Sequence, residues 1–372
     1  MFRTHPLDLP EIRSIIASSL GLKDLASCAR VSQDWNHSFT PQLYNSVVLS
    51  KHGPSMESME RNKRLIQSLK IQSCVYKKKS STSVLYKVIS RIMVNSNLTS
   101  LNLAHNPIGP NGAQALSEAL KINFTLTALD LDDSSIGYDG VVALSEVLKT
   151  NLTLITLNLA DNKIGPSGTQ VLSEALKTNS TLTTLSLGRN LIGVNGAVTL
   201  SEALKTNSTL TALDLDDSSI GYDGVVALLG KNSIGENGAV TLSEALKCNS
   251  TLTSLDLWGN QIGDHGAQAL SKAIKVNSTL TTLDLESNSI GPDGAQALSE
   301  ALKTNSTLTN LNLWRNSIGP HGAQAMSEAL KTNSTLITLK LSTKSIDNNG
   351  AQALSEALRT NSATFTIGLN YE

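Results

Sequence analysis

The sequence contains few cysteines and lacks long apolar runs. Cys28, Cys74 and Cys248 are too few and too scattered to form a disulfide framework or a zinc site. No run of about 18 apolar residues is present, so the sequence offers no candidate for a membrane-spanning helix. The first residues, MFRTHP, also lack the basic-then-apolar pattern of a signal peptide. These absences predict a protein of the cytoplasm or nucleus that does not bind membranes.

Charge is distributed unevenly along a chain whose formal net charge is −1. Residues 1–97 carry 14 Lys+Arg against 6 Asp+Glu, whereas residues 98–372 carry 16 against 25. A phosphate backbone requires a basic track, so we expect no nucleic acid to bind along the acidic part. The histidines are dispersed and no nucleophile–base arrangement is recognisable. We therefore expect a binding protein, not an enzyme, with no cofactor and no metal.

A 28-residue unit recurs from residue 98 onwards, and self-similarity at this period indicates a stacked solenoid. Each unit opens with the apolar pattern L-x-x-L-x-L, whose alternation is typical of a half-buried strand. A glycine-rich turn such as 291–294 follows, which is expected to supply a positive φ and, with Pro292, to open a helix. The next segment, such as 295–303, has apolar residues at helical spacing. The pattern begins at Leu98, Leu126, Leu154, Leu182 and Leu210, and after a break at Leu252, Leu280, Leu308 and Leu336.

A strand, a turn and a helix in each unit require crossover connections, so the strands should stack in parallel. Because helices are bulkier than strands, the stack should bend with its strands on the inner face. In the helix of 295–303 we expect Leu298 and Leu302 to face inward and Ser299, Glu300 and Lys303 to face water.

An asparagine recurs after the last leucine of the strand pattern, and we expect these asparagines to form a buried ladder that hydrogen-bonds the turning backbone. Ser134, Ser218 and Lys344 replace it in three units, which predicts locally weaker turns. The ladder consists of Asn106, Asn162, Asn190, Asn260, Asn288 and Asn316.

The pattern L-x-x-L-x-L-x-x-N resembles the leucine-rich repeats of ribonuclease inhibitor and of NOD-like receptors. It stands almost unaltered at 98–106, 154–162, 182–190, 252–260, 280–288 and 308–316. The resemblance implies an α/β fold, a leucine-rich-repeat solenoid shaped as a horseshoe with a parallel inner sheet and outer helices. It identifies the fold and leaves the function open, because this scaffold carries unrelated binding functions.

The repeat is interrupted between Leu210 and Leu252, which are 42 residues apart instead of 28. Residues 127–144 and 211–228 are identical, which indicates a duplication followed by loss of half a unit, or a mis-assembled gene model. We expect a helix-poor half-repeat near 219–236, in which Ala227 and Leu229 end a strand. The inner sheet would then stay nearly continuous, and the outer layer would have a gap.

Residues 1–50 follow a different pattern, with apolar residues at helical spacing in two or three short segments. The motifs Leu9-Pro10, Asp24-Leu25 and Val31-Ser32 with Trp35 resemble an F-box at the expected relative spacing. The resemblance implies a small all-α module that binds the adaptor subunit of SCF-type ubiquitin ligases. The alternative is a module that only caps the solenoid. The implied adaptor-binding residues are Leu9, Pro10, Ile12, Ile15, Leu20, Leu25, Val31 and Trp35.

The remaining boundaries follow from the repeat. Residues 51–97 are expected to form a linker and a degenerate first repeat that acts as the amino-terminal cap. Residues 98–372 form the repeats, and 362–372 form a degenerate closing cap.

Two tryptophans break the repeat consensus on the concave face. Trp258 and Trp314 share one repeat position and flank Glu286, about 10 Å apart across two strand spacings. Tryptophan and arginine are over-represented at binding hot spots. We expect a protein partner with a basic or polar surface, held by cation–π contacts and charge pairing. The predicted partner-binding residues are Asp256, Trp258, Asp284, Glu286, Trp314 and Arg315.

Other carboxylates, such as Asp130, Asp132 and Asp133, are interpreted as a solvated acidic surface. The combination predicts the substrate-recognition subunit of an SCF-type ubiquitin ligase, with its substrate on the acidic concave face. The alternative is a ligase-independent leucine-rich-repeat scaffold or sensor. A GTPase-activating repeat protein would be a third class, but the sequence carries no distinguishing motif for it.

Overall fold

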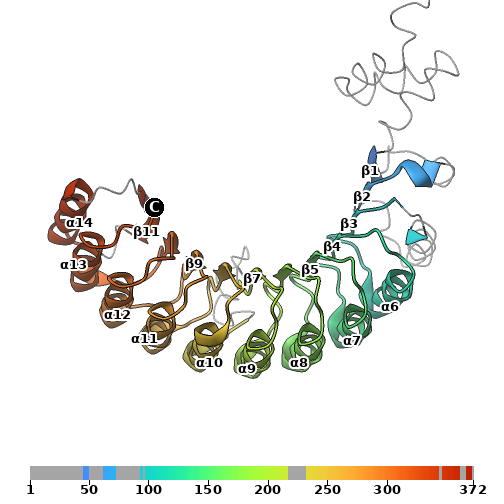
Figure 1. Cartoon of the computed structure of the whole chain (residues 1–372), viewed down its shortest axis with the longest axis horizontal. Helices are drawn as coiled ribbons and strands as arrows, with labels where there is room; N and C mark the ends of the chain where they lie inside the picture. Colours follow the sequence, from blue (N-terminus) through green and yellow to red (C-terminus); the bar gives the residue numbers. More distant parts are fainter. Residues whose placement is uncertain are drawn as a thin grey trace, which may run out of the picture.

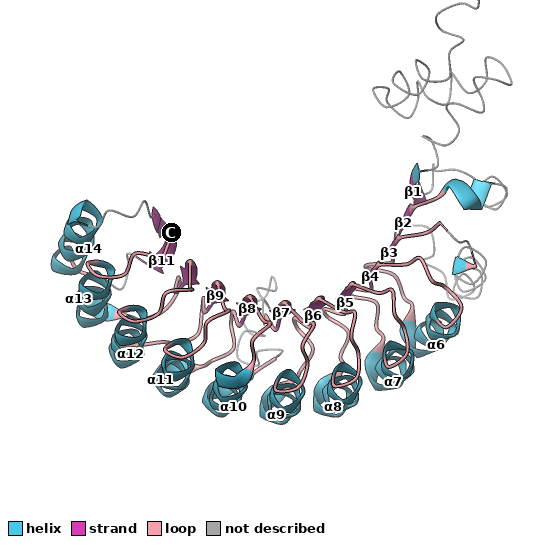
Figure 2. Ribbon diagram, in the orientation of Figure 1, coloured by secondary structure: helices cyan, strands magenta, loops and turns pink. Residues whose placement is uncertain are grey.

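A computed structural model describes residues 45–49, 62–72, 93–94, 97–216, 232–342, 346–360 and 366–370. Twelve described strands form one sheet in chain order, and every neighbouring pair is parallel. The sheet lines the inner side of an arc and the helices line the outer side (Figures 1 and 2). The predicted α/β horseshoe is therefore confirmed for this part of the chain.

Each repeat supplies one short strand to the inner sheet. The strands are β1 (Ser46–Leu49), β2 (Ser68–Ile71), β3 (Ser100–Asn102), β4 (Ala128–Asp130), β5 (Thr156–Asn158), β6 (Thr184–Ser186), β7 (Ala212–Asp214), β8 (Ser254–Asp256), β9 (Thr282–Asp284), β10 (Asn310–Asn312), β11 (Thr338–Ser342) and β12 (Thr366–Asn370).

Each complete repeat also supplies one outer helix, and consecutive helices pack side by side. These helices are α6 (Gly109–Leu120), α7 (Gly137–Leu148), α8 (Gly165–Leu176), α9 (Gly193–Leu204), α10 (Gly235–Cys248), α11 (Gly263–Ile274), α12 (Pro292–Leu302), α13 (Gly319–Leu330) and α14 (Asn348–Thr360). A short 3-10 turn, η2 (Lys63–Leu65), precedes β2. None of the helices in the described ranges is long and apolar enough to cross a membrane.

The core lies between the sheet and the helices. Leu283, Leu285 and Leu298 are at most 1% exposed, and equivalent leucines of the other repeats join one continuous apolar cluster. Close helix packing depends on glycine: a Cβ at Gly294 would lie 2.9 Å from the Ala267 Cβ of the preceding helix. Helices pack about 10 Å apart and strands about 4.8 Å apart, which produces the observed curvature.

Buried asparagines tie neighbouring repeats together at the turn after each strand. Asn288 Nδ2 donates to Leu257 O (2.8 Å) in the preceding repeat and to Glu286 O (3.1 Å) in its own. Asn288 Oδ1 accepts from the N–H groups of Asn260 (2.9 Å) and Ile262 (3.3 Å). The residues on either side of Asn288 have positive φ, so the side chain stabilises a sharply turning backbone. The predicted ladder is confirmed at Asn106, Asn162, Asn190, Asn260, Asn288 and Asn316.

Serine is a weaker substitute in this ladder. Ser134 Oγ lies 3.2 Å from both Leu103 O and Asp132 O. A hydroxyl has one hydrogen to donate, whereas an amide has two, so the serine can satisfy one carbonyl at a time. This favours the predicted weaker turn at Ser134, whereas Lys344 lies outside the described residues.

A second buried asparagine ladder, which the sequence analysis did not identify, runs between the helices and the strands. Asn277 Nδ2 donates to Leu246 O (2.8 Å), and its Oδ1 accepts from the N–H groups of Thr279 (3.0 Å) and Leu280 (2.8 Å). These asparagines open the recurring N-x-T triplets. Each is a structural residue because burial and hydrogen bonding fix its side chain. The ladder consists of Asn123, Asn151, Asn179, Asn207, Asn249, Asn277, Asn305 and Asn333.

Two expectations about the outer helices are wrong. Ser299 is buried instead of facing water, and its hydroxyl donates to Ala295 O (2.7 Å), which satisfies the side chain between neighbouring helices. Gly291 has a φ of −97°, unlike the equivalent glycines, because its N–H donates to Asp264 Oδ1 (2.7 Å) of the preceding repeat. The same carboxylate oxygen accepts the Gly294 N–H (2.8 Å) and caps α12.

The sheet begins earlier than the sequence analysis expected. Strand β1 pairs with β2 in the register Val47↔Leu69, although residues 46–49 were assigned to the amino-terminal module. Val47 and Leu49 are buried at the end of the solenoid core, so these residues belong to the repeat stack. The eight predicted adaptor-binding residues, from Leu9 to Trp35, lie outside the described residues.

The interruption of the repeat is an insertion within an otherwise regular stack. Strand β7 pairs directly with β8, and α10 packs directly on α9, so the continuous sheet is confirmed and the expected outer gap is wrong. Asn232 takes the ladder position, with Nδ2 donating to Leu215 O (3.0 Å) and Asp216 O (2.8 Å). Its Oδ1 accepts the Asn190 N–H (2.7 Å). The extra residues therefore fall between Asp216 and Asn232, and Ser218 is not the ladder residue. Ala227 and Leu229 lie outside the described residues.

Deleting residues 218–231 should restore a regular repeat, because it joins Asp217 to Asn232 and returns the Leu210–Leu252 spacing to 28 residues. We expect this variant to be as stable as the parent chain or more stable by about 1 kcal/mol, since a shorter connection between β7 and α10 costs less closure entropy. Thermal unfolding followed by circular dichroism measures the difference.

A deletion of the same length within an intact repeat is the matched control. Removing residues 162–175 takes out a ladder asparagine and most of α8, so the helical layer loses buried leucines and the melting temperature should fall sharply. Equal damage from both deletions would contradict the interpretation of residues 218–231 as an insertion.

Candidate partner-binding site on the concave face

The predicted partner-binding residues come together on three adjacent strands and the turns that follow them. The Gly259 N–H donates to Glu286 O (2.9 Å), and the Ser287 N–H donates to Trp314 O (3.0 Å), so the segments beyond the strands stay in register. Both tryptophans are half-buried. The three strands that carry the site are β8, β9 and β10. Trp258 follows β8, Glu286 follows β9, and Trp314 and Arg315 follow β10.

The last residue of each strand has a structural role that does not require charge. Asp256 Oδ1 accepts the Trp258 N–H (2.9 Å), and Asn312 Oδ1 accepts the Trp314 N–H (3.1 Å) in the same way. Since either an aspartate or an asparagine makes this bond, the negative charge is additional to what the turn needs. Three neighbouring strands nevertheless carry the acid, and we name them the acidic row: Asp214, Asp256 and Asp284.

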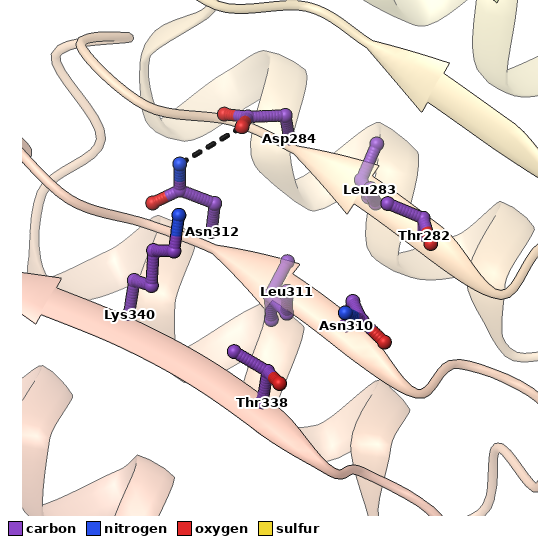
Figure 3. Close-up of a pocket in the computed structure, with 8 residues that line it drawn as sticks. All are labelled: Thr282, Leu283, Asp284, Asn310, Leu311, Asn312, Thr338 and Lys340. Carbon is purple, nitrogen blue, oxygen red and sulfur yellow. Dashed lines mark hydrogen bonds between the residues drawn. The ribbon is translucent and has the colours of Figure 1, made fainter. Parts of the chain in front are cut away.

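The two ends of the acidic row receive neutral donors from the flanking strands. Ser186 Oγ donates to Asp214 Oδ2 (2.6 Å), and Asn312 Nδ2 donates to Asp284 Oδ2 (2.8 Å; Figure 3). Asp256, in the middle, has a carboxylate neighbour on each side. Repulsion between neighbouring carboxylates is therefore greatest at the centre of the row.

Electrostatics single out Asp256. Burial, together with the negative charges of Asp284, Asp214 and Asp216, raises the pKa of Asp256 to about 7, although the bond from the Trp258 N–H opposes the shift. The carboxyl is therefore partly protonated at neutral pH. A cation placed beside it would favour the carboxylate and lower the pKa.

The tryptophan at the other end of the site is already engaged by the chain itself. The Arg315 guanidinium lies 4.4 Å from the Trp314 ring centroid, and Arg315 Nη1 lies 3.9 Å from Glu286 Oε1. Burial raises the pKa of Glu286, although the hydrogen bond from Asn312 and the charge of Arg315 oppose the shift. Arg315 thus takes the place that we expected a partner's cation to occupy at Trp314. Trp258 and the acidic row remain the open part of the site.

The amino-terminal half of the concave face carries a second internal ion pair. Arg189 Nη2 lies 3.3 Å from Asp132 Oδ1, two repeats away, and His105 Nδ1 lies 3.3 Å from Asp133 Oδ2. Burial raises the pKa of Asp132 despite the opposing charges of Arg189 and His105. The interpretation of these carboxylates as a simply solvated surface is therefore wrong for Asp132, which is partly desolvated by the neighbouring strands.

A shallow pocket adjoins the site on the concave face between β9, β10 and β11. Its volume is about 100 Å³, well below the size of small-molecule sites. Figure 3 shows Asp284 and Asn312 turned toward each other, with Lys340 beside Asn312. This pocket is therefore too small to enclose a drug-sized ligand.

Family profiles match this chain over the repeats. A profile described as "Leucine Rich repeat" matches residues 94–117, 123–145, 150–173, 178–201 and 206–229. A second, described as "TMOD/LMOD Leucine-rich domain", matches residues 231–319. The solenoid is a leucine-rich-repeat domain. It is thus a protein-interaction domain, and its concave sheet carries the acidic row.

Two solved structures are similar to the leucine-rich-repeat domain in fold alone. The structure of leiomodin-1 actin-binding site 2 is 24% identical, covers 45% of this chain and 88% of its own, and has a TM-score of 0.36. The crystal structure of the Rad7 and Elc1 complex in yeast is 18% identical, covers 96% of this chain and 92% of its own, and has a TM-score of 0.47. No curated protein matches the chain in sequence.

The sequence analysis missed Asp214 and Asn312 at this site, and Arg189 on the amino-terminal half of the concave face. Asp214 and Asn312 could have been found from the residue between the last two leucines of the strand pattern, which is aspartate in some repeats and asparagine in others. Arg189 gave no such signal, because its pairing with Asp132 spans two repeats.

The stability of the domain should depend on pH through Asp256. The folded pKa of Asp256 lies above the unfolded value of 3.8. The contribution of protonated Asp256 to the free energy of unfolding is therefore fully present below about pH 4 and is lost as pH rises through 7. Asp256→Asn keeps the acceptor for the Trp258 N–H but removes the charge. We expect its melting temperature at pH 8 to exceed that of the parent by about 2–4 °C, equivalent to about 1 kcal/mol. Differential scanning fluorimetry from pH 5 to pH 8 measures both curves.

The control is Asp293→Asn, which changes an exposed carboxylate on α12. It should leave the slope of melting temperature against pH unchanged. If Asp256→Asn has the parent's slope, Asp256 is not the titrating group.

Proposed function

We propose that this chain is a protein-interaction adaptor that binds a basic segment of a protein partner across the acidic row and Trp258. It acts by holding its partner and carries no catalytic activity of its own. We further propose that residues 1–50 bind the adaptor subunit of an SCF-type ubiquitin ligase, which makes the chain a substrate-recognition subunit. The site of action is then the cytoplasm or the nucleus.

The acidic row carries the first part of this proposal. Asparagine would satisfy the turn bond at Asp214, Asp256 and Asp284, as Asn312 does in the next strand, so the turns require no charge. The second carboxylate oxygens of Asp214 and Asp284 also accept hydrogen bonds from Ser186 and Asn312. The charges that act most strongly on Asp256 are the negative charges of Asp284, Asp214 and Asp216. A lysine or arginine of a partner would neutralise this row and could stack on the half-buried Trp258.

A metal ion is the less suitable occupant of the row. Among the residues that the structure describes, no group of three His, Cys, Asp or Glu side chains is arranged to hold one ion. The carboxylates lie in a line on successive strands, which suits an extended basic segment that crosses the strands.

The ligase role is supported by the resemblance of residues 9–49 to an F-box. Its physical logic is tethering: the adaptor raises the local concentration of the bound partner near the ligase without any chemistry of its own. A ligase-independent scaffold or sensor is the competing function, and the two differ in whether residues 1–50 bind the adaptor.

Neutralising the acidic row should weaken binding of a basic peptide. We expect the triple variant Asp214→Asn, Asp256→Asn, Asp284→Asn to bind a fluorescein-labelled peptide of alternating arginine, glycine and serine at least about tenfold less tightly, equivalent to about 1.4 kcal/mol. Fluorescence anisotropy at 0.15 M salt measures the affinity. Trp258→Ala should also weaken it.

The matched control removes the same three charges from the convex helices. Glu146→Gln, Glu174→Gln, Glu202→Gln alters exposed residues whose partners are lysines of the same helices. Its effect on peptide affinity should stay within about twofold, because exposed pairs contribute little. Equal losses in the two triple variants would mean that net charge, and not the concave site, governs binding.

Binding of the ligase adaptor should depend on the Leu9-Pro10 motif. We expect the full chain to co-purify with recombinant SCF adaptor, and Leu9→Ala, Pro10→Ala to abolish co-purification. The acidic-row triple variant should retain it, since the two sites are separate. A parent chain that does not retain the adaptor would support the ligase-independent scaffold.

A further inference from the structure

A cluster of exposed apolar side chains lies at one edge of the sheet, in the first repeats. We name it the amino-terminal apolar patch: Val94 (61% exposed), Ile122 (61%), Phe124 (77%) and Leu152 (72%). Exposed contiguous apolar patches of this kind mark interaction surfaces. We propose that residues 1–44 of the same chain pack on this patch.

The four side chains lie in three consecutive turns. Asn123 Nδ2 donates to Met93 O (2.8 Å), which brings the turn containing Val94 beside the turn containing Ile122 and Phe124. Asn151 Nδ2 donates to Leu120 O (3.4 Å), which places the turn containing Leu152 next in line. The patch therefore spans the turns of three consecutive repeats.

The apolar residues are departures from the repeat and have no role in it. Ser or Thr occupies most of the same repeat positions in the later repeats, and those repeats fold with the same geometry. The position of Phe124 and Leu152 carries Ser180, Ser208, Ser250, Ser278, Ser306 and Ser334, and that of Val94 and Ile122 carries Thr150, Thr178, Thr206, Cys248, Val276, Thr304 and Thr332.

The position of Asn45 identifies the occupant. A row of backbone bonds joins Asn45, Gln67, Thr99 and Thr127 across β1 to β4, from the Gln67 N–H to Asn45 O (3.0 Å) and onward. All strands are parallel, so residues 1–44 join the sheet at the edge where the patch lies, about 14 Å from Thr127. A compact module of 44 residues has a radius of gyration of about 9 Å, which is enough to reach Phe124.

Composition supports the same occupant. Residues 1–44 carry apolar residues at helical spacing, and a bundle of this size is marginal unless another surface covers it. Packing of residues 1–44 on the amino-terminal apolar patch would cover the apolar residues of this segment and those of the patch at the same time. This inference is independent of the ligase proposal, because a module docked by one face can leave the Leu9-Pro10 face free or serve only as a cap.

A photo-crosslinker at the patch tests the contact in the full chain. With benzoylphenylalanine in place of Phe124, irradiation should give crosslinks within the same chain to residues 1–44, identified by mass spectrometry. The same group at position 208, which is the equivalent position three repeats later, should give none. Crosslinks only between two chains, or only to residues 73–92, would overturn the proposal.

Restoring the consensus tests the energetics. Ile122→Thr, Phe124→Ser, Leu152→Ser should preserve the melting temperature of the repeats, since other repeats carry these residues. It should raise the rate of proteolytic cleavage within residues 1–44 at least about tenfold, the change expected for about 1.4 kcal/mol of lost docking. Val276→Thr, a lone exposed valine in a distant repeat, is the control and should change nothing. An unchanged cleavage rate in the triple variant would refute the docking.

Discussion

The hydrogen bonds of the buried asparagines are the constraint on which the rest of this solenoid depends. The asparagines of the first ladder donate to carbonyls in two repeats, and from Asn162 onward each also accepts an N–H group of the repeat before it, so one side chain fixes a turn and the junction between units. The unpaired backbone groups of a sharp buried turn would otherwise be costly. The constraint is strong enough that the chain uses Asn232, beyond an insertion, to complete it.

That constraint keeps strands in register and thereby creates the concave site. Because the repeats stay in phase, aspartates at one repeat position fall side by side on neighbouring strands, and their charges act on each other. The same repetition lets Arg315 and Arg189 neutralise parts of the surface and leave the stretch around Asp256 open. Function on such a scaffold therefore lies in substitutions that the fold does not require.

The two asymmetries of the solenoid lie on different faces. Charge departs from the repeat on the concave strands near β7 to β9, whereas apolar character departs from it at the edge of the first repeats. The concave departure suits a separate partner, because it uses ionic and aromatic groups that tolerate water when free. The apolar departure marks an interaction surface, on which we place residues 1–44 of the same chain.

The sequence alone determined the strand–turn–helix unit, the parallel sheet, the first asparagine ladder and the group of residues around Trp258. These follow from periodicity, which acts locally and repeats. Only the tertiary structure decided that Asn232 replaces Ser218, that Ser299 is buried and that Arg315 already covers Trp314. Those outcomes depend on which atoms of neighbouring repeats meet, and a pattern along one chain does not encode such distances. The raised pKa of Asp256 belongs with them, because it arises from carboxylates that adjoin it only when the strands are stacked.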